Sequence, residues 1–276
     1  MDGQRLVQGN YFRFFAPAIL FFSLLSLFSC SRGLVYHMQE VKKSYNGCKV
    51  ERYKCTYFLV RYPEIVKSPS AKLQEAVNAH VYEFLLHDED YKGANINDVM
   101  KNFFRKYESF KKDFPDSMEN WFVEKNVTVI YKSDSIVSLA KSELAHTGGA
   151  HPYSFVHYTN FDVKTGKIIS LSDILTENYI HPLNDIAEKK FRNDKHLRPD
   201  DNFENSGYWF KNNQFHINDN FTVTNSGLKF TYNSYEIAPY SMGPTELELS
   251  CEELMNILKK DSLLKKKTEY RPASPD

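Results

Sequence analysis

Residues 121–162 carry the clearest periodic pattern of the chain, WFVEKNVTVIYKSDSIVSLAKSELAHTGGAHPYSFVHYTNFD. From Trp121 onward, apolar residues alternate with polar ones at a period of two, which is the spacing of strands that bury one face. Ser133-Asp134 and Gly148-Gly149 interrupt the alternation with residues typical of turns. Three neighbouring strands joined by short turns predict an antiparallel meander.

The segments before this stretch predict two more strands and two helices. Strands are expected over residues 34–45 and 51–62, which are rich in Val, Tyr and Phe, with Pro63 ending the second strand. Ser68 is the expected cap of the first helix and Asn97 that of the second, because both precede apolar residues at helical spacing.

The segments after it mix helices with short strands. A helix is expected over residues 182–195, and Ser250 with Glu253 forms a capping box for a last helix over residues 252–260. Short strands are expected over residues 221–223, 228–232 and 245–249. The whole pattern predicts the α+β class, with an antiparallel β-sheet meander and helices packed on it.

The composition is that of a globular chain without a charge-driven partner. Its 276 residues are 42% hydrophobic and 15% aromatic, with only 11 Gly and 11 Pro, which excludes the disordered and fibrous classes. The 35 Lys and Arg balance the 35 Asp and Glu, so the formal net charge is zero. A nucleic-acid partner is therefore not expected, because the bulk attraction for a phosphate backbone is missing.

The N-terminal residues predict a lipoprotein signal peptide. Arg13 precedes an apolar run over residues 14–28, which has the length of a secretory signal and is too short to span a bilayer. The run ends in Leu27-Phe28-Ser29-Cys30, which resembles the bacterial lipobox. We expect residues 1–29 to be a signal peptide and Cys30 to carry the lipid. An uncleaved anchor helix or a plain signal peptide is the alternative.

This interpretation places the protein in the bacterial cell envelope, attached to the membrane through the lipidated Cys30 and facing the periplasm. Several acyl chains on one residue give stable anchoring. No acidic cluster follows Cys30, so export to the outer cell surface is not indicated. The rest of the chain divides into strands and helices over residues 30–118, an α+β domain over residues 119–262, and a flexible basic tail over residues 263–276.

Three further cysteines follow, at positions 48, 55 and 251. On one continuous strand, Cys48 and Cys55 would lie about 23 Å apart, beyond the reach of a disulfide. They can form a bond only if the chain reverses between them, and the stronger turn signal, Asn46-Gly47, lies outside that segment. The sequence leaves both outcomes open. Cys251 is expected to be a buried thiol.

Histidines around the glycine turn are the densest candidates for chemistry. His146, His151 and His157 lie close in sequence, and neutral imidazoles are common metal ligands. On a strand, however, His151 and His157 would be about 20 Å apart, and only His146 and His151 could meet across the turn. Two ligands do not make a zinc site, so neither a metal nor a cofactor is expected. No HExxH, CxxC or GxSxG motif singles out a catalytic residue.

Two motifs together resemble a known family. The first is HTGGAHPYSFVHYTNFDVKTGKIISLSDIL (His146–Leu175), and the second is GLKFTYNSYEIAPYSMGPTELELS (Gly227–Ser250). In this order they are similar to the domain-of-unknown-function 3298 family, preceded by a segment of the 4163 type. The resemblance extends to the extracytoplasmic domain of the lysozyme-sensing anti-sigma factor RsiV and to the non-catalytic N-terminal region of the deacetylase PdaC.

The resemblance implies a non-enzymatic module that binds or senses a wall glycan such as peptidoglycan, or a lysozyme-like protein. Only about a dozen residues precede the apolar run, and the chain ends soon after the second motif. Neither a sigma-binding segment nor a deacetylase domain is therefore expected. An envelope hydrolase acting on peptidoglycan or another glycan, with a site built only in the folded chain, is the alternative.

The residues that match the two motifs are the candidate ligand contacts. We expect the glycine turn and the EIAPY segment to lie side by side, with tyrosine rings as binding faces and His151 as a hydrogen-bond donor. The alternative is structural, with glycines that supply left-handed backbone and tyrosines that cover the core. The candidates are Thr147, Gly148, Gly149, His151, Tyr153, Tyr235 and Tyr240.

Overall fold

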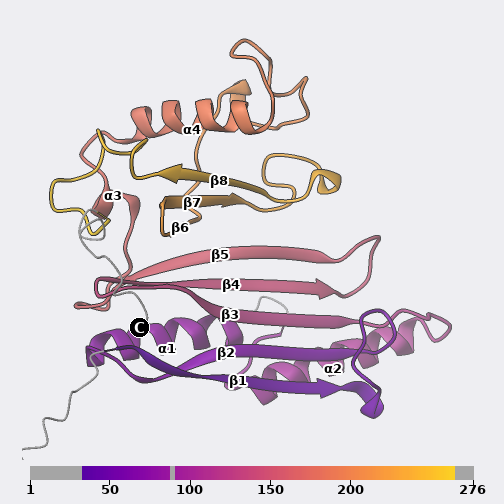
Figure 1. The fold of residues 1–276 in the computed structure, drawn as a ribbon. Helices are drawn as coiled ribbons and strands as arrows, with labels where there is room; N and C mark the ends of the chain where they lie inside the picture. Colours follow the sequence, from indigo (N-terminus) through magenta and orange to yellow (C-terminus); the bar gives the residue numbers. More distant parts are fainter. Residues whose placement is uncertain (1–32, 88–90, 265–276) are drawn as a thin grey trace, which may run out of the picture. The chain divides into compact units, whose positions relative to one another are not determined.

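Eight strands form two sheets in the computed structural model, which describes residues 33–87 and 91–264. The first sheet has the order β1-β2-β3-β4-β5 and the second the order β6-β7-β8 (Figure 1). The strands are β1 (Val35–Ser44), β2 (Tyr57–Lys67), β3 (Phe122–Lys132), β4 (Ile136–His146), β5 (Tyr153–Asp162), β6 (Phe221–Val223), β7 (Gly227–Tyr232) and β8 (Thr245–Ser250). The predicted signal peptide and Cys30 lie outside the described residues.

The predicted α+β class and the meander of β3, β4 and β5 are confirmed, because these strands pair antiparallel in chain order. One pair differs from the expectation of a purely antiparallel sheet. Residues 57–61 of β2 pair parallel with residues 122–126 of β3. A parallel pair needs a crossover connection, and α1 (Ala71–Leu86) and α2 (Ile96–Asp113) supply it.

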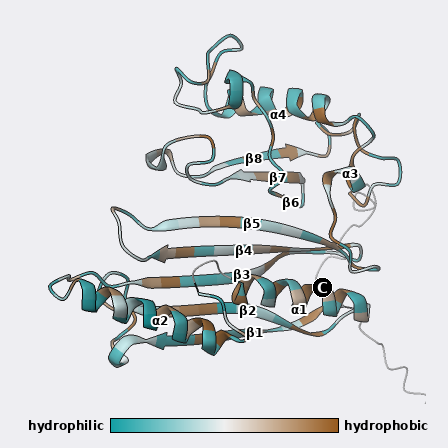
Figure 2. Ribbon diagram, turned by 180° about the vertical axis from the view of Figure 1, so that it is seen from behind, coloured by the Kyte–Doolittle hydropathy of each residue, from teal (hydrophilic) through white to brown (hydrophobic). Residues whose placement is uncertain are grey.

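Both crossover helices contribute to one hydrophobic core on a single face of the first sheet. Leu73, Val77 and Val81 of α1 recur at helical spacing, and Phe103 of α2 is fully buried beside them. Strands β2 to β5 add their residues of one parity to the same core, among them Val127. The bands of hydrophilic and hydrophobic residues along α2 are visible in Figure 2. Among the described helices, none is long and apolar enough to cross a membrane.

The helix caps lie two residues from the predicted positions. Ser70, and not Ser68, caps α1 by accepting a hydrogen bond from the Leu73 amide at 3.1 Å. Asn95, and not Asn97, caps α2: its side chain accepts a hydrogen bond from the Asp98 amide at 3.0 Å and donates one to the Asp98 carboxylate at 2.8 Å. In each case two residues of the same type, Ser68 and Ser70 or Asn95 and Asn97, precede the helix, and the sequence alone does not distinguish which of them is the cap.

Strand β2 also has other limits than predicted. It begins at Tyr57 because the residues before it form a turn, in which the amide of Cys55 donates to the carbonyl of Glu51. Pro63 does not end it, and the strand continues to Lys67 in pairing with β1. Beyond residue 61, β2 has no pairing with β3, so a proline without an N–H fits there.

The C-terminal part forms a second core between the small sheet and the helix α4 (Ile180–Asp194). The predicted helix over residues 252–260 is wrong, and the chain forms successive turns there. The Ser250–Glu253 capping box does form. The chain then leaves the helical path because Thr176 donates to Ile257 and Lys259 donates to Ile174, which join it to the segment after the short helix α3 (Leu171–Ile174).

Asparagine side chains connect β5 to the C-terminal part. The Val156 amide donates to Oδ1 of Asn233 at 2.7 Å, and the Tyr158 amide donates to Oδ1 of Asn220 at 2.9 Å. Nδ2 of both asparagines returns a hydrogen bond to the Val156 carbonyl. Asn160 likewise donates to the carbonyl of Phe221 in β6 at 2.9 Å. Amide side chains thus satisfy the backbone edge that β5 presents away from β4.

The first sheet has two ends that differ in content. We call the end where β1 begins the entry end, and it holds Val35, its partner Lys67, and the last residues of β3 and β5. The opposite end, which we call the glycine-turn end, holds the starts of β2, β3 and β5 and the turn between β4 and β5. Strand β5 alone separates the two ends by about 33 Å.

Candidate functional site

An aromatic cluster forms where the glycine turn meets the loop between β7 and β8. The Nε2 atom of His151 lies 2.9 Å from the hydroxyl of Tyr235. The imidazole also stacks on the ring of Tyr240, with centroids 3.9 Å apart and planes 12° apart. The structure thus brings together two segments that lie more than 80 residues apart, as the sequence predicted, and we call these three residues the His-Tyr cluster.

Backbone geometry at the glycine turn explains the residue types there. Gly148 has a φ of 106° and Gly149 a φ of 95°, a region that residues with a Cβ rarely adopt. The turn follows β4 and leads His151 out of the sheet before β5 begins. Thr147 is exposed beside it. The glycines therefore shape the turn, and the contact with the tyrosines is made by His151.

The YEIAPY segment, residues 235–240, carries both tyrosines and is anchored by the residues between them, with Tyr235 exposed and Tyr240 half-buried. Ile237 and Ala238 are only 3% exposed and anchor the loop in the C-terminal core. Tyr235 is 53% exposed and has a φ of 69°, an uncommon conformation for a bulky side chain. Left-handed backbone at a bulky residue is held by its surroundings, and such positions concentrate at functional sites.

Two further exposed apolar side chains belong to segments next to the YEIAPY segment, and the sequence did not single them out. Trp209 is 49% exposed, and its amide donates to the carbonyl of Ile237 at 2.7 Å. Met242 is 43% exposed and lies two residues after the stacked Tyr240, in the same short helical turn. No local motif marks Trp209, because it reaches the site through the irregular chain that precedes β6. Tyr153 is exposed at the start of β5 with its ring 5.6 Å from Phe155, so its role as a ligand contact stays a prediction.

The other histidines of the motif lie elsewhere. His146 is buried, and its ring packs against Tyr53 at 5.5 Å and Phe122 at 5.9 Å. It therefore does not face His151 across the turn. Within residues 33–87 and 91–264, no group of three His, Cys, Asp or Glu side chains is arranged to hold a metal ion.

Of the two outcomes that the sequence left open for Cys48 and Cys55, the structure has the disulfide, with Cα atoms 5.8 Å apart. The chain reverses twice, through a short helical turn over Tyr45–Gly47 and through the turn that ends at Cys55. Cys251 is a free thiol but is half-buried, and not buried as predicted. It lies where the chain leaves β8 for the surface turns.

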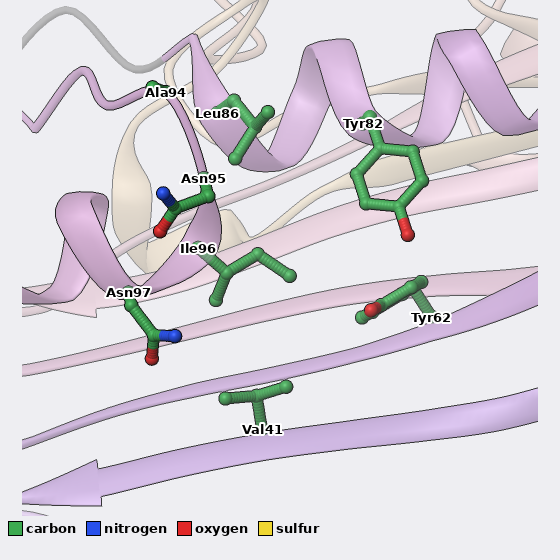
Figure 3. A pocket seen from close by; sticks show the side chains of 8 residues that line it. All are labelled: Val41, Tyr62, Tyr82, Leu86, Ala94, Asn95, Ile96 and Asn97. Carbon is green, nitrogen blue, oxygen red and sulfur yellow. The ribbon is translucent and has the colours of Figure 1, made fainter.

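A separate hollow of about 330 Å³ lies between β1, β2 and the two crossover helices (Figure 3). Tyr62 and Tyr82 face it from one side, and Val41 and Ile96 complete its apolar wall. Among the described residues, those that line the hollow are apolar, aromatic or amide side chains.

The site and the fold define an α+β protein with an exposed aromatic cluster at a sheet end, and comparisons with known proteins agree. Residues 172–252 match the family described as a protein of unknown function, DUF3298, and residues 50–154 match the family described as deacetylase PdaC. The predicted resemblance to these families is confirmed. His151 lies in the segment that matches the PdaC family, and both tyrosines of the His-Tyr cluster lie in the segment that matches the DUF3298 family. The cluster is therefore a contact between the two matched segments.

Two solved structures share the fold. A member of the DUF3298 family from Bacteroides fragilis has a TM-score of 0.70 and 21% sequence identity, and the match covers 87% of this chain and 99% of that one. A DUF3298 family protein from Pseudomonas aeruginosa has a TM-score of 0.60 and 21% identity, over 82% of this chain and 95% of that one. No curated protein matches this chain significantly.

Proposed function

We propose that this chain is a non-enzymatic binding or sensing module of the bacterial cell envelope, held to the membrane through a lipid on Cys30. Its ligand is a wall glycan, and the His-Tyr cluster with Trp209 is the binding surface. The observation that carries this proposal is the contact of the exposed His151 and Tyr235 with the half-buried ring of Tyr240, beside a segment anchored in the core.

The chemistry of the surface fits a sugar. Aromatic rings offer flat apolar faces for the C–H side of a pyranose, and their polar edges accept and donate hydrogen bonds. His151 and Tyr235 place two such polar groups beside the stacked rings. Because the rings are held by packing before a ligand arrives, little side-chain freedom is lost on binding.

The proposal is tested by calorimetry with the chain from Ser31 onward and soluble disaccharide-peptide fragments of peptidoglycan. We expect Tyr240→Ala to weaken binding at least tenfold, because it removes the ring on which His151 stacks. Tyr53→Ala is the control for the loss of a tyrosine ring elsewhere, because Tyr53 is 54% exposed and lies outside the cluster.

The outcomes separate the candidate functions. Equal losses in both variants, or no binding of the fragments, would overturn the glycan ligand. Binding of lysozyme that depends on Tyr240 would move the proposal to a protein partner at the same surface. Turnover of the fragments by the wild-type chain would favour the hydrolase alternative.

The lipid anchor has its own test in whole cells. Cys30→Ala is expected to remove the acyl mass from the processed chain and to release it from the membrane fraction. An unchanged mass and an unchanged membrane fraction would refute lipidation at this residue.

A further inference from the structure

Five exposed lysines gather at the entry end of the first sheet. The residues are Lys67, Lys72, Lys132, Lys164 and Lys167. Lys67 pairs with Val35, and Nζ of Lys132 lies 3.5 Å from the carbonyl oxygen of Leu34. A Cβ on Gly166 would lie 2.6 Å from the carbonyl oxygen of Lys72, so the turn over residues 164–167 packs directly on the start of α1.

Acidic groups at this end do not balance the lysines. Asp134 lies in the turn between β3 and β4, and Asp162 accepts hydrogen bonds from the amide and hydroxyl of Thr165. Asp173 is bound within the cap of α3 by Ser170. Among the described residues, none of the five lysines forms an ion pair. Glu75, one turn along α1 from Lys72, is a further acidic group near this end, so the five lysines outnumber four acidic side chains although the whole chain is neutral.

Exposed apolar side chains lie among these lysines. Val35 is 40%, Val66 44% and Ile168 57% exposed. A surface of lysines with interspersed apolar residues is typical of contact with a lipid headgroup region.

We propose that the entry end lies on an anionic phospholipid surface, so that the lysines hold the domain in one orientation on the membrane. This inference rests on the proposed lipid anchor. Cys30 precedes Val35 by five residues, and a fully extended chain of that length spans at most about 18 Å. A lipid on Cys30 would therefore hold Val35, at the entry end, within about 18 Å of the anchored residue.

The orientation has a consequence for the proposed ligand. The His-Tyr cluster lies at the glycine-turn end, about 33 Å along β5 from the entry end. With the lysines on the membrane, the cluster points away from it, toward the wall.

The test uses the chain from Ser31 to Asp276, which has no lipid. Residues 32–276 form one compact unit, and the three hydrophobic clusters of the described residues lie between residues 34 and 264, so this chain keeps the folded core. We measure co-sedimentation with vesicles of phosphatidylcholine alone and of phosphatidylcholine with one quarter phosphatidylglycerol. Binding is expected only with phosphatidylglycerol and is expected to fall in 0.5 M salt, since salt screens surface charge.

Two triple variants with the same change in net charge locate the contact. Lys67→Glu, Lys132→Glu and Lys164→Glu together are expected to lower binding at least tenfold. Lys49→Glu, Lys54→Glu and Lys112→Glu, which change exposed lysines away from the entry end, are expected to lower it less than twofold. Both chains keep residues 265–276, so a difference between them does not come from the tail.

Equal effects of the two triple variants, or no binding to either vesicle, would overturn the membrane contact. Vesicle binding without an acyl group on Cys30 in cells would instead overturn the anchor and leave the basic surface standing. The two failures are therefore distinguishable.

Discussion

The two ends of the first sheet are built from the same strands and differ in almost every other respect. The glycine-turn end is cross-linked by the Cys48–Cys55 disulfide and filled with rings that pack on the buried Phe122. The entry end consists of short turns and strand termini with exposed lysines. The two ends of one sheet thus suit two different tasks. The cross-linked, ring-filled end can keep a binding surface in a fixed conformation, and the charged end can orient the domain by electrostatic attraction.

A polar network supports the glycine-turn end. Arg52 donates two hydrogen bonds to the carboxylate of Glu124, at 2.9 Å and 2.7 Å, and the hydroxyl of Tyr57 donates to the same group. The Arg52 guanidinium holds the pKa of Glu124 below its usual value. Burial and the neighbouring carboxylate raise the pKa of the Tyr57 phenol. The network therefore stays a charged pair with a neutral donor over the physiological pH range.

The largest expected effect is the loss of a ring at the glycine-turn end. Phe122→Ala removes a fully buried side chain from contact with Tyr53, Tyr57 and His146, and we expect the free energy of unfolding to fall by about 3–5 kcal/mol. Ile168→Ala at the entry end, where the side chain is mostly exposed, should change it by less than about 0.5 kcal/mol. Urea denaturation of both variants measures these changes. Similar losses in the free energy of unfolding would contradict the proposed difference between the two ends.

Loss of the disulfide is next in size. Cys48→Ser with Cys55→Ser should lower the free energy of unfolding by about 2–3 kcal/mol, because the bond restricts a short loop of the unfolded chain. Treatment of the wild-type chain with a thiol reductant should give the same loss, and the double variant should not respond to it. A response of the double variant would point to a different cause.

An acid-sensitive contact lies between the two ends. His80 of α1 bonds to Thr159 at 2.8 Å, and burial, with a smaller effect of Lys141, lowers its pKa to about 4. The folded chain keeps this imidazole neutral, while the unfolded chain protonates it near pH 6.5. Since the unfolded state then binds more protons, this contribution to stability is complete above pH 6.5 and is lost as the pH falls toward 4.

We expect this single group to lower the free energy of unfolding by up to about 3 kcal/mol over that range. His80→Gln keeps a hydrogen-bonding group for Thr159 and removes the titration, so its stability should depend less on pH. The measurement is urea denaturation at pH 7, 5.5 and 4. If the free energy of unfolding fell equally with pH in the wild-type chain and in His80→Gln, groups other than His80 would govern the acid response.

Tyr235→Asn should separate stability from binding. Asparagine adopts left-handed backbone more readily than tyrosine, so the free energy of unfolding should stay constant or rise by up to about 1 kcal/mol. Binding of the peptidoglycan fragments should fall, because the hydroxyl that bonds to His151 is lost. Tyr53→Asn offers the same backbone relief and should leave binding unchanged.

The smallest effect on stability is expected at the entry end. Lys164→Glu changes an exposed side chain in a turn and should alter the free energy of unfolding by less than about 0.5 kcal/mol. The lysine-to-glutamate triple variant of the entry end should likewise unfold cooperatively while losing its vesicle binding. A large loss of stability would mean that these lysines stabilise the folded domain and that the lost vesicle binding follows from unfolding.

Local patterns predicted most elements of the fold. The period-two alternation after Trp121 predicted β3, β4 and β5, and the helical spacing of residues such as Val77 and Phe103 predicted the crossover helices. The division into two sheets could not be predicted, because the amide contacts of Asn220 and Asn233 join segments far apart in sequence. The same reason explains the missed turns after Ser250, where long-range backbone bonds replace a helix that the local sequence favours.

The candidate site was predicted in part. The motifs contain His151, Tyr235 and Tyr240, and the structure brings these three side chains together. Trp209 could not be found from sequence, because its exposure depends on the path of an irregular segment. The lysines of the entry end are spread over 100 residues of a neutral chain, so only the register of the strands gathers them.

The asparagines beside β5 bear on how the protein avoids aggregation. An unpaired strand edge is a template on which another chain can add a strand. Each asparagine accepts a hydrogen bond from a backbone N–H of β5 with its carbonyl oxygen and donates one to a backbone carbonyl of β5 with its NH2 group, and so occupies the edge of β5 without extending the sheet. Among the described residues, no strand pairs with the outer edge of β1, which carries charged side chains such as Glu40 and Lys42 that discourage pairing. Under partial unfolding, self-association of this protein should therefore begin at β1.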